Sequence, residues 1–323
     1  MIITVTPNAA LDKTIQVPSM QLGMRHRGAQ GLVAPGGKGI NVARALHILQ
    51  EPVIATGLVG GETGSRILRE LAGEGILSDF VSIAGESRSS TVLIDPTSGR
   101  QTEIIENGPS VTVQELDALL DRLEYVSRDA YAVVLAGSLP RDVSEDWYGD
   151  AIKRLRKSGT HLILDSEGEP LRQGVSAEPY LVAPNQREAE DLVGHEFGGE
   201  SDVVDALDEI ADMGVRNVLI TTETGVAALL REGGQTRRFQ VQAPRVEVLS
   251  TVGSGDVLLA GYLSSRMRGG TAEDALRYGV ACGTASTLVA GAARFDPREI
   301  KRQLANTTLR ELSLRQIPAE AIE

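Results

Sequence analysis

Two glycine-rich stretches, each followed by a helical pattern, contain the residues of this sequence best suited to chemistry. The first is VAPGGKGINVARAL, residues 33–46, and the second is TVGSGDVLLAG, residues 251–261. Glycine lets the backbone approach a bound molecule closely, and the free N–H groups at the start of a helix carry partial positive charge. Both stretches therefore predict backbone cradles for anions.

The first cluster does not match the common nucleotide-binding motifs. A P-loop aligned on Lys38 would have Leu32 in place of its first glycine and Gly39 in place of its hydroxyl residue. The G-x-G-x-x-G pattern is also missing from this stretch. Lys38 still adds a full charge to the cradle, and Asn41, one turn into the helix, could reach a hydroxyl. The alternative is a glycine turn that packs the helix start, with Lys38 in solvent.

The second cluster places an acid at the start of an apolar, hence buried, helix. A carboxylate in such a place is costly unless it is hydrogen-bonded or functional. The amides of Gly253, Ser254 and Gly255 would point to one spot and form an anion hole beside Asp256. A base next to an anion hole is what phosphoryl transfer to an alcohol requires. The alternative is that Asp256 only caps the helix.

The elements around these clusters follow a regular alternation. Residues 2–6 read as a strand, and residues 37–49 and 63–74 read as helices. Strands that alternate with helices predict a mostly parallel sheet with helices on both faces. Two segments, about 13–35 and 88–107, break the alternation and predict a small extra sheet suited to act as a lid. An antiparallel edge of the main sheet is the alternative for them.

Composition limits the class of protein. The 323 residues carry a formal net charge of −12, which argues against nucleic acid or an anionic membrane as partner. Cys282 is the single cysteine, so no disulfide can form within the chain, and we expect a cytoplasmic protein. The four histidines have no spacing typical of a zinc site, so we expect no structural metal. The last residues, 309–323, read as a helix and a loose tail.

Six motifs in order resemble the PfkB sugar kinases, a ribokinase-like family. The two glycine clusters resemble its two signatures, and TVTPNAALD, residues 4–12, resembles its opening strand with a sugar-binding aspartate, Asp12. LAGSLP (135–140) and LDSEGEPL (164–171) follow in the expected order, and APNQREAE (183–190) matches the N-x-x-E element. The resemblance extends from about residue 2 to 295. It departs from the family pattern at Glu167, where a small residue is common, and at Ser254.

The resemblance implies a fold and an activity. The fold is a single ribokinase-like α/β domain over residues 1–323, a three-layer sandwich with a small β-sheet lid. The activity is transfer of the γ-phosphoryl group of ATP, with Mg²⁺, to a phosphorylated ketohexose, foremost fructose 1-phosphate to fructose 1,6-bisphosphate. Tagatose 6-phosphate, fructose 6-phosphate, an unphosphorylated sugar or a nucleoside are alternative acceptors, and a sugar-phosphate-binding regulator without catalysis is the alternative outside enzymes. A homodimer through the lid sheets is also implied.

The resemblance also implies roles for individual residues. Asp256 would be the catalytic base, beside the anion hole of Gly253, Ser254 and Gly255. The residues implied for the sugar phosphate are Asp12, Arg27, Gly36, Gly37, Lys38, Asn41, Arg88 and Ser138, with Lys38 and Arg88 on its phosphate. The residues implied for ATP and Mg²⁺ are Asn185, Glu188, Thr222, Gly225, Gly253 and Gly255, with Glu188 holding the metal through water.

Overall fold

The short apolar runs of the sequence assemble into one eleven-stranded sheet in the computed structural model, which describes residues 1–312. Neighbouring strands follow the order β15 (Thr308–Leu312), β14 (Gln235–Gln242), β13 (Gly225–Glu232), β12 (Asn217–Thr222), β11 (Leu181–Val182), β10 (His161–Asp165), β9 (Ala132–Ala136), β1 (Ile2–Thr6), β4 (Val53–Gly60) and β5 (Leu77–Ser78), and β6 (Val81–Ile83) also pairs with β4. All pairs from β12 to β5 and β6 are parallel, and β12 to β15 are antiparallel. The predicted mostly parallel sheet is therefore confirmed.

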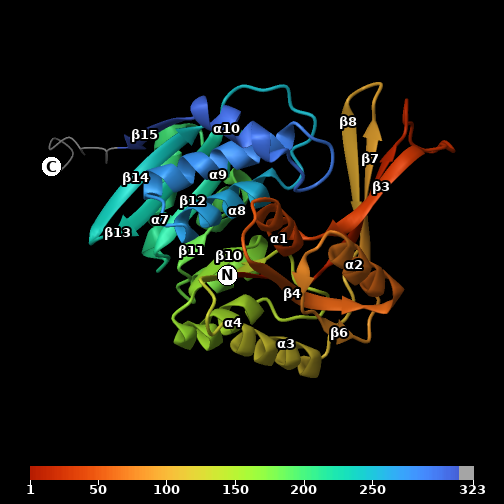
Figure 1. The fold of residues 1–323 in the computed structure, drawn as a ribbon, viewed down its shortest axis with the longest axis horizontal. Coiled ribbons are helices and arrows are strands. Elements are labelled where there is room, and N and C mark those ends of the chain that lie inside the picture. Colours follow the sequence, from red (N-terminus) through yellow and green to blue (C-terminus); the bar gives the residue numbers. More distant parts are fainter. Residues whose placement is uncertain (313–323) are drawn as a thin grey trace.

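Helices cover both faces of this sheet, which gives three layers (Figure 1). One face carries α1 (Lys38–Ile48), α2 (Gly61–Gly73), α8 (Ser254–Met267), α9 (Ala272–Thr287) and α10 (Pro297–Ala305). The other face carries α3 (Val113–Val126), α4 (Trp147–Leu155), α5 (Gly168–Val175), α6 (Gln186–Val193) and α7 (Glu200–Asp212), with the short 3-10 helix η1 (Arg156–Ser158) after α4. Among the residues described, no helix has the length and apolar character that crossing a bilayer requires.

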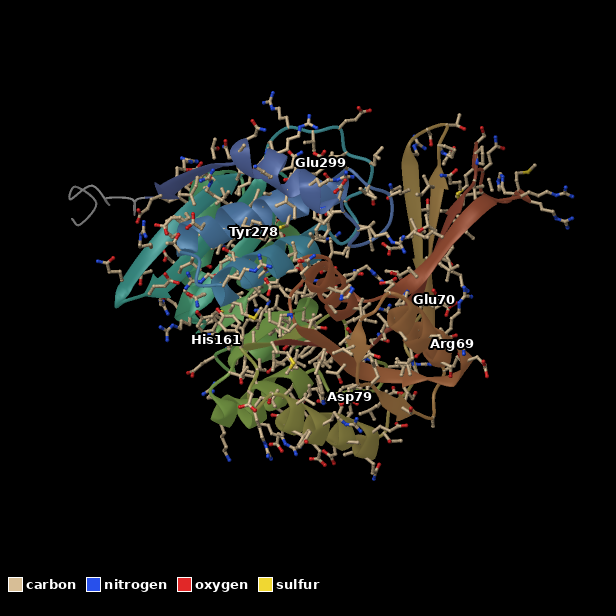
Figure 2. The ribbon with its side chains drawn as sticks, viewed as in Figure 1. Arg69, Glu70, Asp79, His161, Tyr278 and Glu299 are labelled. Atoms are coloured by element: carbon tan, nitrogen blue, oxygen red, sulfur yellow. The ribbon has the colours of Figure 1, made fainter. Side chains whose placement is uncertain are left out.

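The layers follow from the side-chain periods of strand and helix. On β9, Val134 packs into the core on one face of the sheet and Val133 into the core on the other. On α2, Ile67 is fully buried, whereas Arg69 and Glu70 project from the helix to the surface (Figure 2). Central strands therefore need apolar residues at every position, and surface helices only along one stripe.

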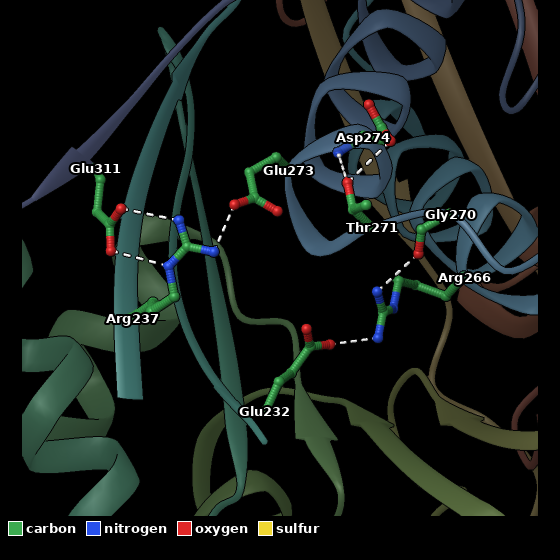
Figure 3. A network of polar contacts seen from close by, with 8 residues as sticks. All are labelled: Glu232, Arg237, Arg266, Gly270, Thr271, Glu273, Asp274 and Glu311. Carbon is green, nitrogen blue, oxygen red and sulfur yellow. Dashed lines mark hydrogen bonds and ion pairs between the residues drawn. The ribbon is translucent and has the colours of Figure 1, made fainter. Parts of the chain in front are cut away.

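The antiparallel edge is joined to the helices by ion pairs (Figure 3). Arg237 of β14 bonds Glu311 of β15 at 2.8 Å and Glu273 of α9 at 2.5 Å, and Arg266 of α8 bonds Glu232 at the end of β13. This edge corrects one expectation. Residues 309–312 belong to β15 and not to a helix, because their backbone pairs with β14. The remainder of that expectation, residues 313–323, lies outside the described residues.

A separate four-stranded sheet stands beside the main body (Figure 1). Its order is β3 (Ala29–Gly36), β2 (Ala10–Gln16), β7 (Arg88–Asp95) and β8 (Arg100–Ile105). The two segments that break the strand–helix alternation thus form the predicted small sheet, and the alternative of an edge of the main sheet is wrong. We call these four strands the small sheet.

Asp95 joins the two hairpin ends of the small sheet. Its carboxylate accepts hydrogen bonds from the backbone N–H groups of Ser19 at 2.9 Å, Met20 at 3.3 Å and Thr97 at 2.9 Å. Burial opposes ionisation of this carboxyl group, but the backbone hydrogen bonds outweigh it and lower the pKa of Asp95 to about 2. The small sheet is therefore held as one unit at neutral pH.

Candidate active site

A cavity of about 820 Å³ lies where the parallel strands end, between the main body and the inner face of the small sheet. Open parallel sheets bind ligands outside the carboxyl ends of their strands, because helix starts and loops meet there. Most residues predicted for the site line this one cavity: Asp12, Gly37, Lys38, Asn41, Arg88, Ser138, Asn185, Glu188, Gly253, Ser254, Gly255 and Asp256.

Asp256 lies in the first turn of α8 and is buried, with 6% of its surface exposed. Its carboxylate accepts a hydrogen bond of 2.8 Å from the Asn41 side-chain amide. Burial and the neighbouring Asp165 raise the pKa of Asp256 to about 7, against the lowering effect of Lys38 and Asn41. A carboxylate with this pKa is suited to accept a proton near neutral pH.

The start of α8 offers backbone amides beside this carboxylate. Gly253 precedes the helix with φ +76°, a left-handed conformation that favours glycine. The N–H of Ser254 already donates to the carbonyl of Thr251 at 3.1 Å. This corrects the predicted anion hole, because the amide of Ser254 is used in a turn. The N–H groups of Gly253, Gly255 and Asp256, in the unpaired first turn, remain to bind an anion.

Lys38 was expected to bind the phosphate of the sugar, but its ammonium group pairs with carboxylates of the protein. Its ammonium donates to Asp165 at 2.8 Å and to Glu188 at 2.9 Å, so it lies between two nearly buried carboxylates. Burial alone would lower the pKa of Lys38, but the two carboxylates outweigh it and raise the pKa. The ammonium is therefore always charged, and its charge is already offset within the protein.

The N-x-x-E element forms a helix cap at the start of α6. The Asn185 side chain accepts from the Glu188 N–H at 2.9 Å, and the Glu188 carboxylate accepts from the Asn185 N–H at 2.8 Å. The second carboxylate oxygen of Glu188 faces Lys38. Burial raises the pKa of Glu188, against the effect of Lys38. The cap thus fixes this carboxylate toward the cavity.

Asp12 and Arg88 bring the small sheet to the same cavity. The Asp12 carboxylate lies against Gly36, where an added Cβ would come within 1.9 Å of it, so a larger residue there would displace the Asp12 side chain. Arg88 donates through Nε to the carbonyl of Asn8 at 3.2 Å. Burial raises the pKa of Asp12, and Arg88 opposes that shift. The Asp12 carboxylate could therefore accept hydrogen bonds from a ligand at this end of the cavity.

A second cavity of about 1320 Å³ lies along β12 and the start of α8. It contains Thr222 and Gly225, as expected of the nucleotide residues. Five residues border both cavities: Asn185, Thr221, Thr251, Ser254 and Gly255. The two cavities therefore meet at the start of α8, next to Asp256, and could hold two ligands whose reacting groups touch.

Two predicted residues line neither cavity. Arg27 is exposed in the loop between β2 and β3 and lines neither cavity, so its role on the sugar stays a prediction. Gly36 lies behind Asp12. The lining residues that were not predicted include Asn8, Asp165 and Arg141. Asp165 carried a usable signal, since it ends the apolar strand HLILD at the edge where ligands bind.

Metal binding by protein groups alone is not supported in the described part of the chain. Residues 1–312 contain no group of three His, Cys, Asp or Glu side chains that could hold a metal ion. Asp165 and Glu188 both line the first cavity, and the two carboxylates share one cation, Lys38. Magnesium commonly uses one or two carboxylates, substrate phosphates and waters, so these two residues fit an ion that arrives with a nucleotide.

The chain is similar to known proteins over nearly its whole length. The chain is 31% identical to a 1-phosphofructokinase of Borreliella burgdorferi, over 97% of this chain and 99% of that protein. It resembles the crystal structure of phosphofructokinase-2 from Escherichia coli, with a TM-score of 0.88 and 28% identity over 94% of this chain and 98% of that one. It also resembles a possible 1-phosphofructokinase from Thermotoga maritima, with a TM-score of 0.87 and 26% identity over 97% of this chain and 100% of that one.

The ribokinase-like fold expected from the sequence is confirmed by the likeness of the chain to these structures. The family model of the pfkB family carbohydrate kinases matches residues 6–299, which contain both glycine clusters, the N-x-x-E element and Asp256. The chain therefore belongs to the pfkB family of carbohydrate kinases.

Proposed function

We propose that this kinase transfers the γ-phosphoryl group of ATP to a hydroxyl of a phosphorylated ketohexose, foremost fructose 1-phosphate to give fructose 1,6-bisphosphate. The observation that carries the proposal is the buried Asp256, with a raised pKa, at the junction of two cavities and beside unpaired helix amides. The name of the Borreliella burgdorferi relative supports fructose 1-phosphate as the acceptor. Fructose 6-phosphate and tagatose 6-phosphate are the alternatives.

The reaction follows from the roles of four groups. Asp12 accepts hydrogen bonds from sugar hydroxyls and orients the ring, which places the attacking hydroxyl near Asp256. Asp256 accepts the hydroxyl proton while the oxygen–phosphorus bond forms and the bond from the γ-phosphorus to the bridging oxygen of ADP breaks. The N–H groups of Gly253, Gly255 and Asp256 stabilise the negative charge on the phosphoryl oxygens in transfer.

Magnesium would bind with the nucleotide at Asp165 and Glu188, through water. The residues fit because both carboxylates face the cavity and the Asn185 cap holds Glu188 in place. When bound, the ion neutralises charge on the phosphates and helps orient them. Thr222 and Gly225 lie in the second cavity, which we assign to the rest of the ATP.

We assign Lys38 to the junction of the cavities and not to the sugar's own phosphate. Its ammonium offsets Asp165 and Glu188, and its charge lowers the pKa of Asp256. Without a cation there, three nearby carboxylates would repel one another and the incoming phosphates. Lys38 therefore supports both ATP binding and ionisation of the base.

Asp256→Asn should reduce kcat by about 10² to 10⁴-fold, since the variant cannot accept the proton of the attacking hydroxyl. In the wild type, kcat/KM should rise with pH and level off above an apparent pKa of about 7, because only the ionised Asp256 acts as a base. A coupled ADP-release assay across pH 5.5 to 9 measures both. Asp150→Asn on the exposed face of α4 is the control, and activity of Asp256→Asn within tenfold of wild type would disprove the base assignment.

Lys38→Met should reduce kcat by about 10² to 10³-fold, the usual cost of losing a group that stabilises transferring charge. It should also move the acidic limb of the pH profile to higher pH, because Lys38 lowers the pKa of Asp256. The same assay measures rate and limb, with Lys153→Met on α4 as the matched lysine control. An unchanged limb would show that Lys38 does not act on Asp256.

We infer that the protein is a cytoplasmic homodimer whose small sheets face each other, and that the small sheet closes over the sugar. The small sheet and its loops expose large apolar side chains, with Leu22 92%, Met24 65% and Ile104 55% exposed. Monomeric proteins rarely leave such residues grouped on one element. The sole cysteine, buried and free, supports a cytoplasmic location.

Light scattering of the purified protein at micromolar concentration should give twice the mass of one chain. Ile104→Glu should shift it toward the mass of one chain, because a carboxylate cannot be buried in an apolar interface without a partner. Val113→Glu, on α3 and also exposed, should leave the dimer intact. A wild-type protein with the mass of one chain would contradict the dimer.

The substrate itself is tested with Mg-ATP and a panel of fructose 1-phosphate, fructose 6-phosphate, tagatose 6-phosphate, fructose, ribose and adenosine. One phosphorylated ketohexose should exceed every unphosphorylated compound by about 10²-fold or more in kcat/KM, because a polar site left unfilled rejects the smaller analogue. Preference for fructose, ribose or adenosine would overturn the proposed substrate class. Absence of ADP release with every acceptor would instead favour a regulator without catalysis.

A further inference from the structure

The charged residues that line the first cavity are mostly acidic, yet the proposed substrate brings a phosphate that needs cations to bind it. Acidic residues predominate among the lining groups: Asp12, Glu103, Glu106, Asp165, Glu167, Glu188 and Asp256. The basic lining residues are Lys38, Arg88 and Arg141. Lys38 is occupied by two carboxylates, so the two arginines are the cations left to bind an anion. The following inference rests on the proposed function, in which the sugar carries such an anion.

Both arginines are held in the same way. Arg88 donates through Nε to the carbonyl of Asn8 at 3.2 Å, and Arg141 donates through Nε to the carbonyl of Gly108 at 3.3 Å. Neither forms an ion pair with a carboxylate within residues 1–312, the described part of the chain. An Nε bond to a carbonyl fixes the guanidinium plane and leaves the terminal nitrogens to donate to a phosphate in a fork.

Asn8 and Gly108 place the two arginines close together. The Asn8 side-chain amide donates to the Ser138 hydroxyl and to the Leu139 carbonyl, each at 3.2 Å, while the backbone carbonyl of Asn8 accepts from Arg88. A Cβ on Gly108 would lie 2.2 Å from the Asn8 side-chain oxygen, so these two residues are in direct contact. Arg88 and Arg141 therefore lie on either side of one Asn8–Gly108 contact, with Ser138 beside them.

We propose that Arg141 is a specificity-determining residue that binds, together with Arg88, the phosphate already present on the sugar. Arg88 alone would bind a phosphate weakly, because the nearby carboxylates of Asp12, Glu167 and Glu103 partly offset its positive charge. Arg141 supplies a second guanidinium whose charge no described carboxylate offsets. Because Arg88 belongs to the small sheet and Arg141 to the main body, the bound phosphate also ties the two parts together.

Arg141→Met should raise KM for fructose 1-phosphate, or for the phosphorylated ketohexose that the panel selects, by about 10- to 100-fold, the value of a charged hydrogen-bond pair. KM for Mg-ATP should stay within about twofold, since Arg141 lies in the first cavity and not in the second. Arg141→Lys should recover only part of the loss, because an ammonium keeps the charge without the fork.

Asp142→Asn is the matched control. Asp142 accepts from the Ser110 hydroxyl at 2.6 Å, and so holds the same segment that Arg141 contacts at Gly108, but it does not line the cavity. The KM of the Asp142→Asn variant for the sugar phosphate should match that of the wild type. The comparison separates an effect on phosphate binding from an effect on the position of residues 106–111.

Three outcomes would overturn the inference, and they are distinguishable. An unchanged sugar-phosphate KM in Arg141→Met, in an enzyme whose wild type prefers a phosphorylated ketohexose, would remove Arg141 alone. A KM raised equally for Mg-ATP would likewise show a general structural effect. Wild-type preference for an unphosphorylated acceptor would overturn the proposed function, and the role of Arg141 with it.

Discussion

The site depends on one ammonium group held between two carboxylates. Asp165, Glu188 and Asp256 are all buried at the same edge of the sheet, where each would repel the others and resist ionisation. Lys38 donates to the first two and lowers the pKa of the third. Removing one partner of a buried ion pair costs about 3–5 kcal/mol, because the remaining charge is left without compensation. The protein can therefore keep its base and its acidic residues in one cleft only with this cation in place.

The topology of the sheet makes that contact possible. Lys38 is the first residue of α1, Asp165 is the last residue of β10, and Glu188 lies in the first turn of α6. Strands β1, β9, β10 and β11 are consecutive neighbours and all parallel, so the segments that leave their carboxyl ends meet at one edge. Asn41 follows Lys38 by three residues, on the same side of α1, and reaches Asp256 at the start of α8. The first turn of α1 thus supports both the acidic pair and the base.

The sequence was sufficient for the features that depend on local pattern. Strand–helix alternation predicted the layered sheet, and its two interruptions predicted the small sheet. The position of Asp256 followed from an acid at the start of an apolar helix, and its burial is as expected. The partners of Lys38 could not be predicted, because they lie 127 and 150 residues away along the chain. The use of the Ser254 amide could not be predicted either, since it depends on one turn to Thr251.

The different hydrogen-bonding capacities of lysine and arginine explain how a cavity lined by acidic residues could bind the phosphate of a sugar in addition to ATP. A lysine ammonium is a compact charge, and two carboxylates at hydrogen-bond distance leave it little capacity for another ligand. An arginine can give its Nε to a backbone carbonyl and still present two terminal nitrogens, as Arg88 and Arg141 do. In the proposed site, the charge that stabilises the protein and the charge that binds substrate are therefore on different residues. Such separation lets Lys38 keep its two carboxylate partners in the absence of ligand, whereas the arginines keep unfilled hydrogen-bond capacity that a phosphate can use.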